Sequence, residues 1–159
     1  MFIFKSLRTT LIILIGIYAS GAMAGSATKI TLSGVDKRSA ITQVPELWLD
    51  FEKANYLHST LKSSPQKVYV VYDAFAKDYL QADVLIGYDV RDLKRYKHSE
   101  AINVDKFTQV LAKGIYSSKQ LTDAWQAFDY RKQVKAVLEI HTLASLGNKE
   151  QVALYVQYQ

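Results

Sequence analysis

Glu139 and His141 are the residues whose chemistry and spacing point most directly to a site. They stand in the segment AVLEIHTL, residues 136–143, whose composition favours a β-strand. Alternate side chains of a strand share a face, so both would lie beside Val137. A carboxylate there attracts cations, and an imidazole can transfer protons near neutral pH. Taken alone, the segment fits an amphipathic strand with Glu139 in water better, because glutamate is rarely buried.

A second feature is the stretch VYVVYDAFAKDYLQADVLIGYDV, residues 68–90, which has two apolar runs around a polar, acidic middle. Tyrosine favours strands, which explains part of this pattern without any ligand. Tyr69 and Tyr72 fall on opposite faces of the first run, so we expect one of them to face a pocket. The hairpin would then form the wall of a pocket for an aromatic or cationic molecule. Asp73 and Asp78 are interpreted as loop and capping groups, not as a catalytic acid pair.

Trp48 and Trp125 are further candidates for contacting a ligand. Both fall on apolar stripes with helical spacing, which favours a place in the core. Tryptophan is usually only partly buried, so each ring also suits the wall of a cleft. Tyr88 and Phe107 are weaker candidates of the same kind.

Other chemistries have little support in the sequence. There is no cysteine, which excludes disulfides, thiol catalysis and thiolate metal sites. His58, His98 and His141 lack metal-ligand spacing, and no phosphate-binding or dinucleotide-binding glycine motif is present. The net charge is a mild +5, and the basic run at residues 91–97 contains Asp92, so a solvated loop is a better interpretation than a nucleic-acid surface. We therefore expect no metal, no cofactor and no nucleic-acid partner.

The first 24 residues have the pattern of a secretory signal peptide. In MFIFKSLRTTLIILIGIYASGAMA, basic residues come first, an apolar run follows, and small residues supply a cleavage site. The apolar run is far shorter than the ~20 residues of a membrane-spanning helix. An uncleaved anchor is the alternative. Cleavage would leave residues 25–159 as one periplasmic or secreted domain, with no membrane span and a core that holds it without disulfides.

Two helices should position these side chains. VPELWLDFEKANYL and LTDAWQAFDYRK each carry four apolar residues at i, i+3, i+4 and i+7. Pro45 suits the first turn of the first helix, and Ser117 with Gln120 can form a capping box for the second. The quartet recurs 77 residues later, as Val44, Leu47, Trp48 and Phe51, then Leu121, Ala124, Trp125 and Phe128.

Each helix stands in the same order of expected strands. One strand precedes it and two follow, at residues 29–38, 67–75 and 83–90 in the first half and at 107–114, 136–143 and 151–158 in the second. This repeated order favours an internal duplication. We expect an α+β fold of two βαββ units, with a mostly antiparallel sheet, two helices and a ligand cleft where the units meet.

The order of these motifs resembles the GyrI-like small-molecule-binding superfamily, which includes the effector-binding domains of AraC-type and MerR-type multidrug regulators. The resemblance rests on VYVVYDAFAKDYLQADVLIG, AKGIYSSKQLTDAW and the strand glutamate in LEI, and it extends over about residues 29–158. It implies two βαββ halves about a pseudo-twofold axis. It also implies an aromatic pocket between the halves, with a buried glutamate at its base that receives cationic lipophilic ligands.

Transferred to this chain, the resemblance places Glu139 at the base of the pocket and favours Tyr72 as the tyrosine that faces it. A cation held there would gain roughly 0.5–2 kcal/mol per good cation–π contact. The family commonly has a tyrosine where this chain has His141. We expect ligand contacts from Glu139, Trp125, Trp48, Tyr72, His141, Tyr88 and Phe107.

The sequence thus predicts an exported, stand-alone member that binds a small cationic or aromatic molecule. Some members of the superfamily resemble hydrolases of small reactive compounds. If this chain is such a hydrolase, Glu139 would be the base, assisted by His141 or Tyr72. An envelope protein-interaction module that has lost the pocket is the other alternative. A homodimer formed through a sheet edge also stays open.

Overall fold

The computed structural model describes residues 28–144 and 149–159, so the expected signal peptide lies outside the described residues. The centre is a curled, seven-stranded antiparallel sheet in the order β4-β1-β3-β2-β6-β7-β5. The strands are β1 (Lys29–Ala40), β2 (Lys67–Asp73), β3 (Gln81–Asp89), β4 (Glu100–Asn103), β5 (Thr108–Gly114), β6 (Val134–Thr142) and β7 (Gln151–Tyr158). The helices are α1 (Val44–Glu52), α2 (Asn55–His58) and α3 (Ser118–Gln126), with single 3₁₀ turns η1 (Ile41–Gln43), η2 (Val90–Asp92) and η3 (Val104–Lys106).

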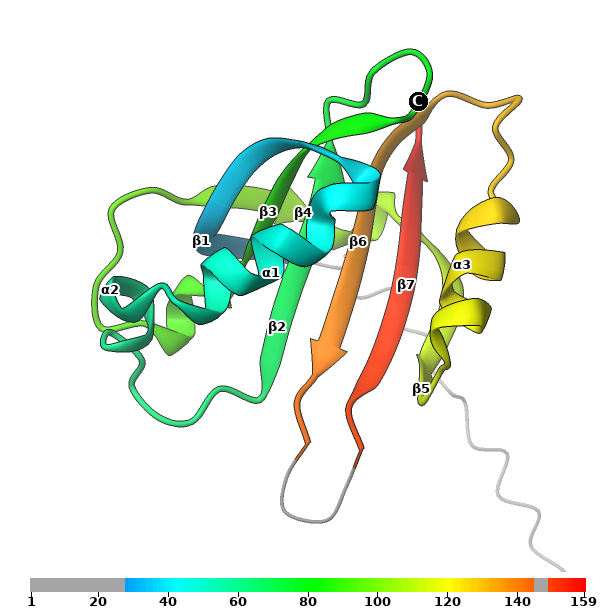
Figure 1. The fold of residues 1–159 in the computed structure, drawn as a ribbon. Coiled ribbons are helices and arrows are strands. Elements are labelled where there is room, and N and C mark those ends of the chain that lie inside the picture. The colour runs from blue at the N-terminus through cyan, green and yellow to red at the C-terminus, as the bar shows by residue number, and fades with distance from the viewer. Residues whose placement is uncertain (1–27, 145–148) are drawn as a thin grey trace, which may run out of the picture.

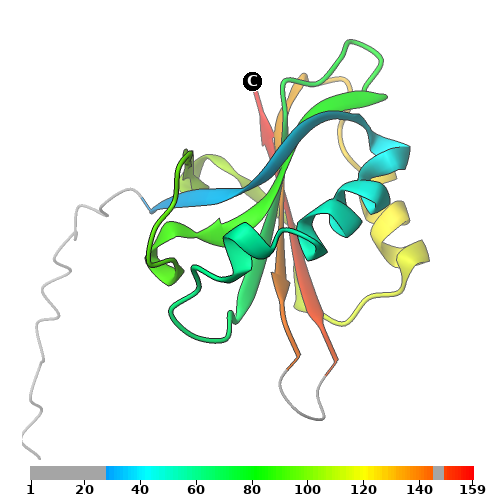
Figure 2. The same ribbon diagram turned by 60° about the vertical axis from the view of Figure 1, so that its left-hand side comes forward.

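The duplicated βαββ architecture is confirmed. Apart from β4, the strands of the first unit run β1-β3-β2 towards the centre of the sheet, and those of the second unit run β5-β7-β6. The two units meet where β2 pairs with β6. This mirrored order is that of a pseudo-twofold axis through the centre of the sheet. Both longer helices, α1 and α3, lie on the same face of the sheet (Figures 1 and 2).

Strand β4 is an addition to the duplicated frame that the sequence did not predict. It pairs with β1 at one edge of the sheet. It has four residues, of which only Ile102 is buried. A segment this short offers too little alternation to be recognised as a strand.

Local sequence explains where the helices begin. Pro45 occupies the first turn of α1, and Ser117 caps α3 in a capping box with Gln120, as predicted. The first helix is shorter than the sequence pattern suggested, because it ends at Glu52 and a separate turn, α2, follows.

Two apolar cores cover the two faces of the sheet. The helix-side core joins α1 and α3 to Val70, Ile86, Val137, Leu154 and their neighbours. The opposite core is smaller and contains Ile30, Leu32, Tyr69, Val71, Leu85, Ile102 and Leu138. Tyr72 therefore faces the helices and Tyr69 faces away from them, as the strand alternation predicted.

Gly34 and Gly87 face each other across β1 and β3. A Cβ atom added to Gly87 would overlap the carbonyl oxygen of Ser33, and one added to Gly34 would overlap that of Ile86. The backbones approach so closely that only glycine fits at both positions.

Residues 91–97 comprise the end of η2 and the loop that follows it, and only Leu93 among them is buried, in agreement with the solvated segment expected from the sequence. The loop is anchored at its start, because the guanidinium of Arg91 pairs with the buried carboxylate of Asp89 at 2.6 Å. Within the described residues, no helix has the length and apolar character needed to cross a membrane.

Candidate functional site

The centre of the site is the strand pair β2/β6, on the face that carries the helices. Val70 and Glu139 are direct cross-strand partners there. Tyr72 and His141 each lie two residues further along their own strand, so both point to the same face. The site therefore forms where the two duplicated units meet.

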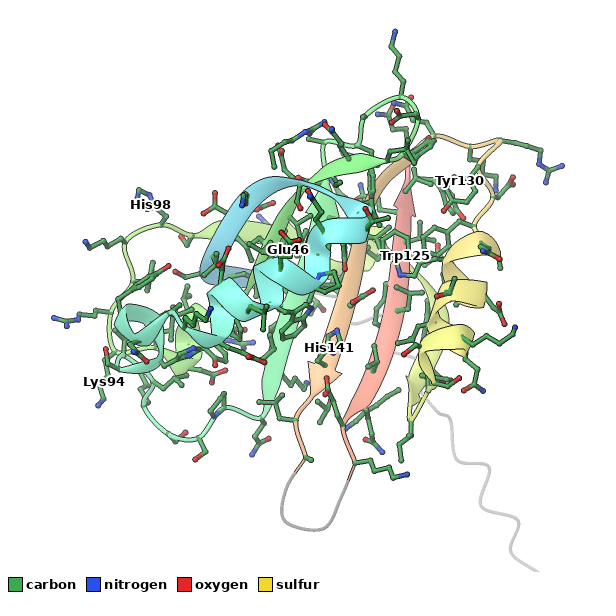
Figure 3. The ribbon with its side chains drawn as sticks, viewed as in Figure 1. Glu46, Lys94, His98, Trp125, Tyr130 and His141 are labelled. Carbon is green, nitrogen blue, oxygen red and sulfur yellow. The ribbon has the colours of Figure 1, made fainter. Side chains whose placement is uncertain are left out.

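Each helix places its tryptophan against a ring from the other unit. Trp125 of α3 meets Tyr72 of β2 with ring centroids 4.9 Å apart and an interplanar angle of 79°. Trp48 of α1 meets His141 of β6 at 5.0 Å and 66°. Both are edge-to-face contacts, which aromatic rings favour. Figure 3 shows His141 over β6 and Trp125 on the side of α3 nearest the sheet.

The carboxylate of Glu139 has a partner on each oxygen. The indole Nε1 of Trp125 donates to Oε1 at 3.0 Å, and Nε2 of His141 lies 3.1 Å from Oε2. The Glu139 side chain is only 12% exposed. The carboxylate is thus largely shielded from water and hydrogen-bonded, in contrast to the solvated orientation that the segment alone favoured.

His141 joins two carboxylates. Its Nδ1 lies 2.6 Å from Oε1 of Glu150, while Nε2 faces Glu139. Carboxylates only accept hydrogen bonds, so both contacts are hydrogen bonds when both ring nitrogens carry protons. Burial by itself lowers the pKa of His141, but hydrogen bonding to Glu139 and the charges of Glu139 and Glu150 outweigh it and raise the pKa above its ordinary value.

Tyr72 is held as a neutral phenol. Burial is the main cause that raises its pKa well above the ordinary value, and the negative charge of Glu139 adds to it. The ring belongs to the helix-side core. Tyr72 therefore supplies an aromatic surface and a neutral hydroxyl group beside the carboxylate.

A hollow of about 530 Å³ opens beside His141 on the α1 side of the site. Its lining is Trp48, Phe51, Glu52, His58, Val68, Tyr88, His141, Leu143 and Glu150. Among these described residues there are two carboxylates and no lysine or arginine, so the hollow favours positive charge. Glu139, Tyr72 and Trp125 are not in the lining, because the hollow ends at His141.

Tyr88 lies in this hollow next to His58. The sequence suggested Tyr88 as a site residue but not His58. His58 Nε2 lies 2.7 Å from the carbonyl oxygen of Phe51, and its Nδ1 lies 3.1 Å from the Tyr88 hydroxyl. Because a carbonyl only accepts, Nε2 carries a proton, and in the neutral ring Nδ1 then accepts from the Tyr88 hydroxyl. Burial raises the pKa of Tyr88, so this hydroxyl stays protonated.

The sequence also missed Glu52 and Glu150 as lining residues. Glu52 follows Phe51 of the predicted apolar stripe, and only the helix geometry turns it toward the hollow. Glu150 is brought beside His141 by the pairing of β6 with β7, in which Thr142 faces Gln151. Nothing in the spacing of these residues along the chain marks this contact.

Phe107 does not belong with the other predicted residues. It packs against the smaller core on the opposite face of the sheet. There it lines a separate hollow of about 450 Å³, together with Asp73 and Glu100 among others. The structure thus brings together six of the seven predicted residues around the β2/β6 pair, on the face covered by α1 and α3. It places Phe107, between η3 and β5, on the opposite face.

No set of three or more His, Cys, Asp or Glu side chains in residues 28–144 and 149–159 is arranged to hold a metal ion.

The duplicated βαββ sheet with its two covering helices has a counterpart among solved structures. No family model matches the chain, and no curated protein matches its sequence. The fold is similar to that of SAV2435, solved bound to tetraphenylphosphonium, with a TM-score of 0.51 and 10% identity over 82% of this chain and 89% of that one. At this identity the likeness shows the fold.

Proposed function

We propose that this chain is an exported protein that binds a small lipophilic cation between its two units, as expected of a GyrI-like small-molecule-binding protein. The observation that carries the proposal is Glu139, a carboxylate only 12% exposed among the rings of Tyr72 and Trp125. A largely buried negative charge beside aromatic rings favours a cation that has lost its water.

The comparison with SAV2435 supports the same class of ligand, since tetraphenylphosphonium is an aromatic cation and the two folds are alike. The hollow beside Trp48 and His141 supports it as well, because its lining is aromatic and acidic. Export is the part of the proposal that rests on residues 1–24 alone. Cell fractionation of the full chain, with and without those residues, tests it.

The binding test uses tetraphenylphosphonium as the probe and follows tryptophan fluorescence of the chain from residue 25. Wild-type protein should show saturable quenching, because Trp48 lines the hollow and Trp125 lies next to it, against Glu139. Glu139→Gln keeps the shape but removes the charge, and it should weaken binding at least tenfold. Glu46→Gln is the matched control, since Glu46 is an exposed residue of α1 (Figure 3). Equal affinity of the Glu139→Gln variant and the wild type would refute the proposed role of the charge.

A hydrolase is the second candidate, and the contact between Glu139 and His141 at 3.1 Å favours it. A carboxylate beside an imidazole can act as a general base with proton transfer. Turnover of a small electrophile that persists in Glu139→Gln would eliminate this alternative. The interaction-module alternative expected a cleft filled by side chains, and the hollow of about 530 Å³ argues against it.

A further inference from the structure

His141 stands between the open hollow and the buried carboxylate. It lines the hollow, whereas Glu139 does not, and it covers Oε2 of Glu139 from 3.1 Å. The other oxygen already accepts a hydrogen bond from Trp125. A cation that enters the hollow therefore finds both oxygens of Glu139 occupied.

We propose that ligand binding is coupled to deprotonation of His141. In the ligand-free protein the imidazolium of His141 is the cation held in the site, and each monocation that binds replaces one proton. This inference rests on the proposed function and states how that site would be regulated. The proton leaves Nε2 for water as the ligand enters, so the net charge of the site is the same before and after the exchange.

The geometry favours such an exchange for electrostatic reasons. While His141 bridges Glu139 and Glu150, its positive charge repels a second cation in the same hollow. Once the proton has left Nε2, the ring nitrogen and Oε2 of Glu139 are both acceptors and no longer attract each other. The remaining proton on Nδ1 keeps the 2.6 Å bond to Glu150, so the ring retains an anchor while Glu139 becomes free.

The groups that face His141 come from every element around the hollow. Opposite His141 on β2 lies the apolar Val68, and the ring above it is Trp48 of α1. The titratable residues are Glu139 of β6, Glu150 before β7, Glu52 of α1, His58 of α2 and Tyr88 of β3. The three carboxylates favour the imidazolium, whereas Tyr88 and His58 lie 3.1 Å apart and pair with each other, so neither of them bridges two carboxylates.

The raised pKa of His141 agrees with this arrangement, because it keeps the ring protonated at pH values where an ordinary histidine is neutral. Cation binding should then strengthen as the pH rises toward that raised pKa. Above the raised pKa, affinity should become independent of pH.

Calorimetric titration with tetraphenylphosphonium between pH 5.5 and 9 tests the exchange, since this probe has no titratable group. Wild-type affinity should rise about tenfold per pH unit below the raised pKa of His141 and then level off. Below that pKa, repeating the titration in buffers of different ionisation enthalpy should show close to one proton released per cation bound. His141→Gln should lose both the slope and the released proton, and the exposed His98→Gln should keep both (Figure 3).

Wild-type binding that is independent of pH would overturn the exchange and leave the proposed function intact. A slope retained in His141→Gln would assign the proton to another group and would also overturn it. Nitrogen NMR of the ligand-free wild type gives a readout that needs no variant: at pH 6.5, where an ordinary histidine is half protonated, both ring nitrogens of His141 should be mostly protonated, and a mostly neutral ring there would overturn the inference. If no protein binds the probe at any pH, the proposed function falls, and the exchange falls with it.

Discussion

The indole nitrogen of Trp125 donates to the carboxylate of Glu139 at 3.0 Å, which joins helix α3 to the central strand β6 by a polar bond above the sheet. The same indole ring rests against Tyr72 from the other unit. The position of α3 is therefore tied to the charge at the centre of the site.

Replacing Trp125 by phenylalanine should weaken both the fold and the site. The ring is largely kept, but Oε1 of Glu139 loses its donor in a place that water reaches poorly, so the free energy of unfolding should fall by about 1–3 kcal/mol. Urea unfolding measures it. Trp48→Phe is the control, because Trp48 contacts His141 by its ring rather than donating to Glu139. Equal losses in the two variants would show that the hydrogen bond contributes nothing specific.

The bridge through His141 should make stability depend on pH. The pKa of His141 is raised in the folded chain, so its stabilising effect is fully present below the unfolded value of about 6.5 and disappears as the pH rises through the raised pKa. The difference in unfolding free energy between wild type and His141→Gln should therefore shrink from pH 6 to pH 9. Glu150→Gln should show a smaller version of the same trend, because one of the two carboxylate partners remains. A difference that grows with pH would contradict the sign of this shift.

The glycine pair in β1 and β3 should not tolerate a side chain. Gly87→Ala would place a methyl group against the backbone of Ser33 and Gly34, which cannot move away without breaking the strand pairing, and we expect a loss of about 1–3 kcal/mol. Gly114→Ala is a matched control at the end of β5, where the nearest atoms belong to the Tyr116 side chain. Thermal unfolding of the two variants compares them, and similar midpoints would show that the close approach is not essential.

Asp89 and Arg91 should support the start of the long loop after β3. The Asp89 side chain is only 4% exposed. Burial raises its pKa, but the hydrogen bonds and charge of Arg91 lower the pKa by more, so it lies below the ordinary value. Arg91→Gln should cost about 1–2 kcal/mol near neutral pH, a modest figure because the arginine is largely in water. Because the pKa of Asp89 is lowered in the folded chain, this contribution is present above pH ~4 and is lost as the pH falls further. The exposed Arg95→Gln should leave stability unchanged in the same urea titration.

The duplicated βαββ fold could be predicted from the sequence because the apolar patterns that indicate its helices and strands are local and occur in both halves. The tryptophan stripes of α1 and α3 and the alternation of Tyr69 with Tyr72 follow directly from the periods of helix and strand. The bridge through His141 could not be predicted in this way, since Glu150 reaches it only through the pairing of β6 with β7. Phe107 was misplaced for a related reason, because an aromatic residue at a strand end gives no indication of which sheet face it will join.

Val70 and Glu139 occupy the same place in the two units, directly across the pseudo-twofold axis, yet one is apolar and the other is charged. A site with true twofold symmetry would present any ligand with two equivalent orientations. Here a single carboxylate stands at the centre, a phenol lies on one side and an imidazole on the other. Duplication alone would give two equivalent orientations for a ligand, and the different side chains of the two units make these orientations unequal. An asymmetric molecule at this junction would therefore have one preferred pose in place of two.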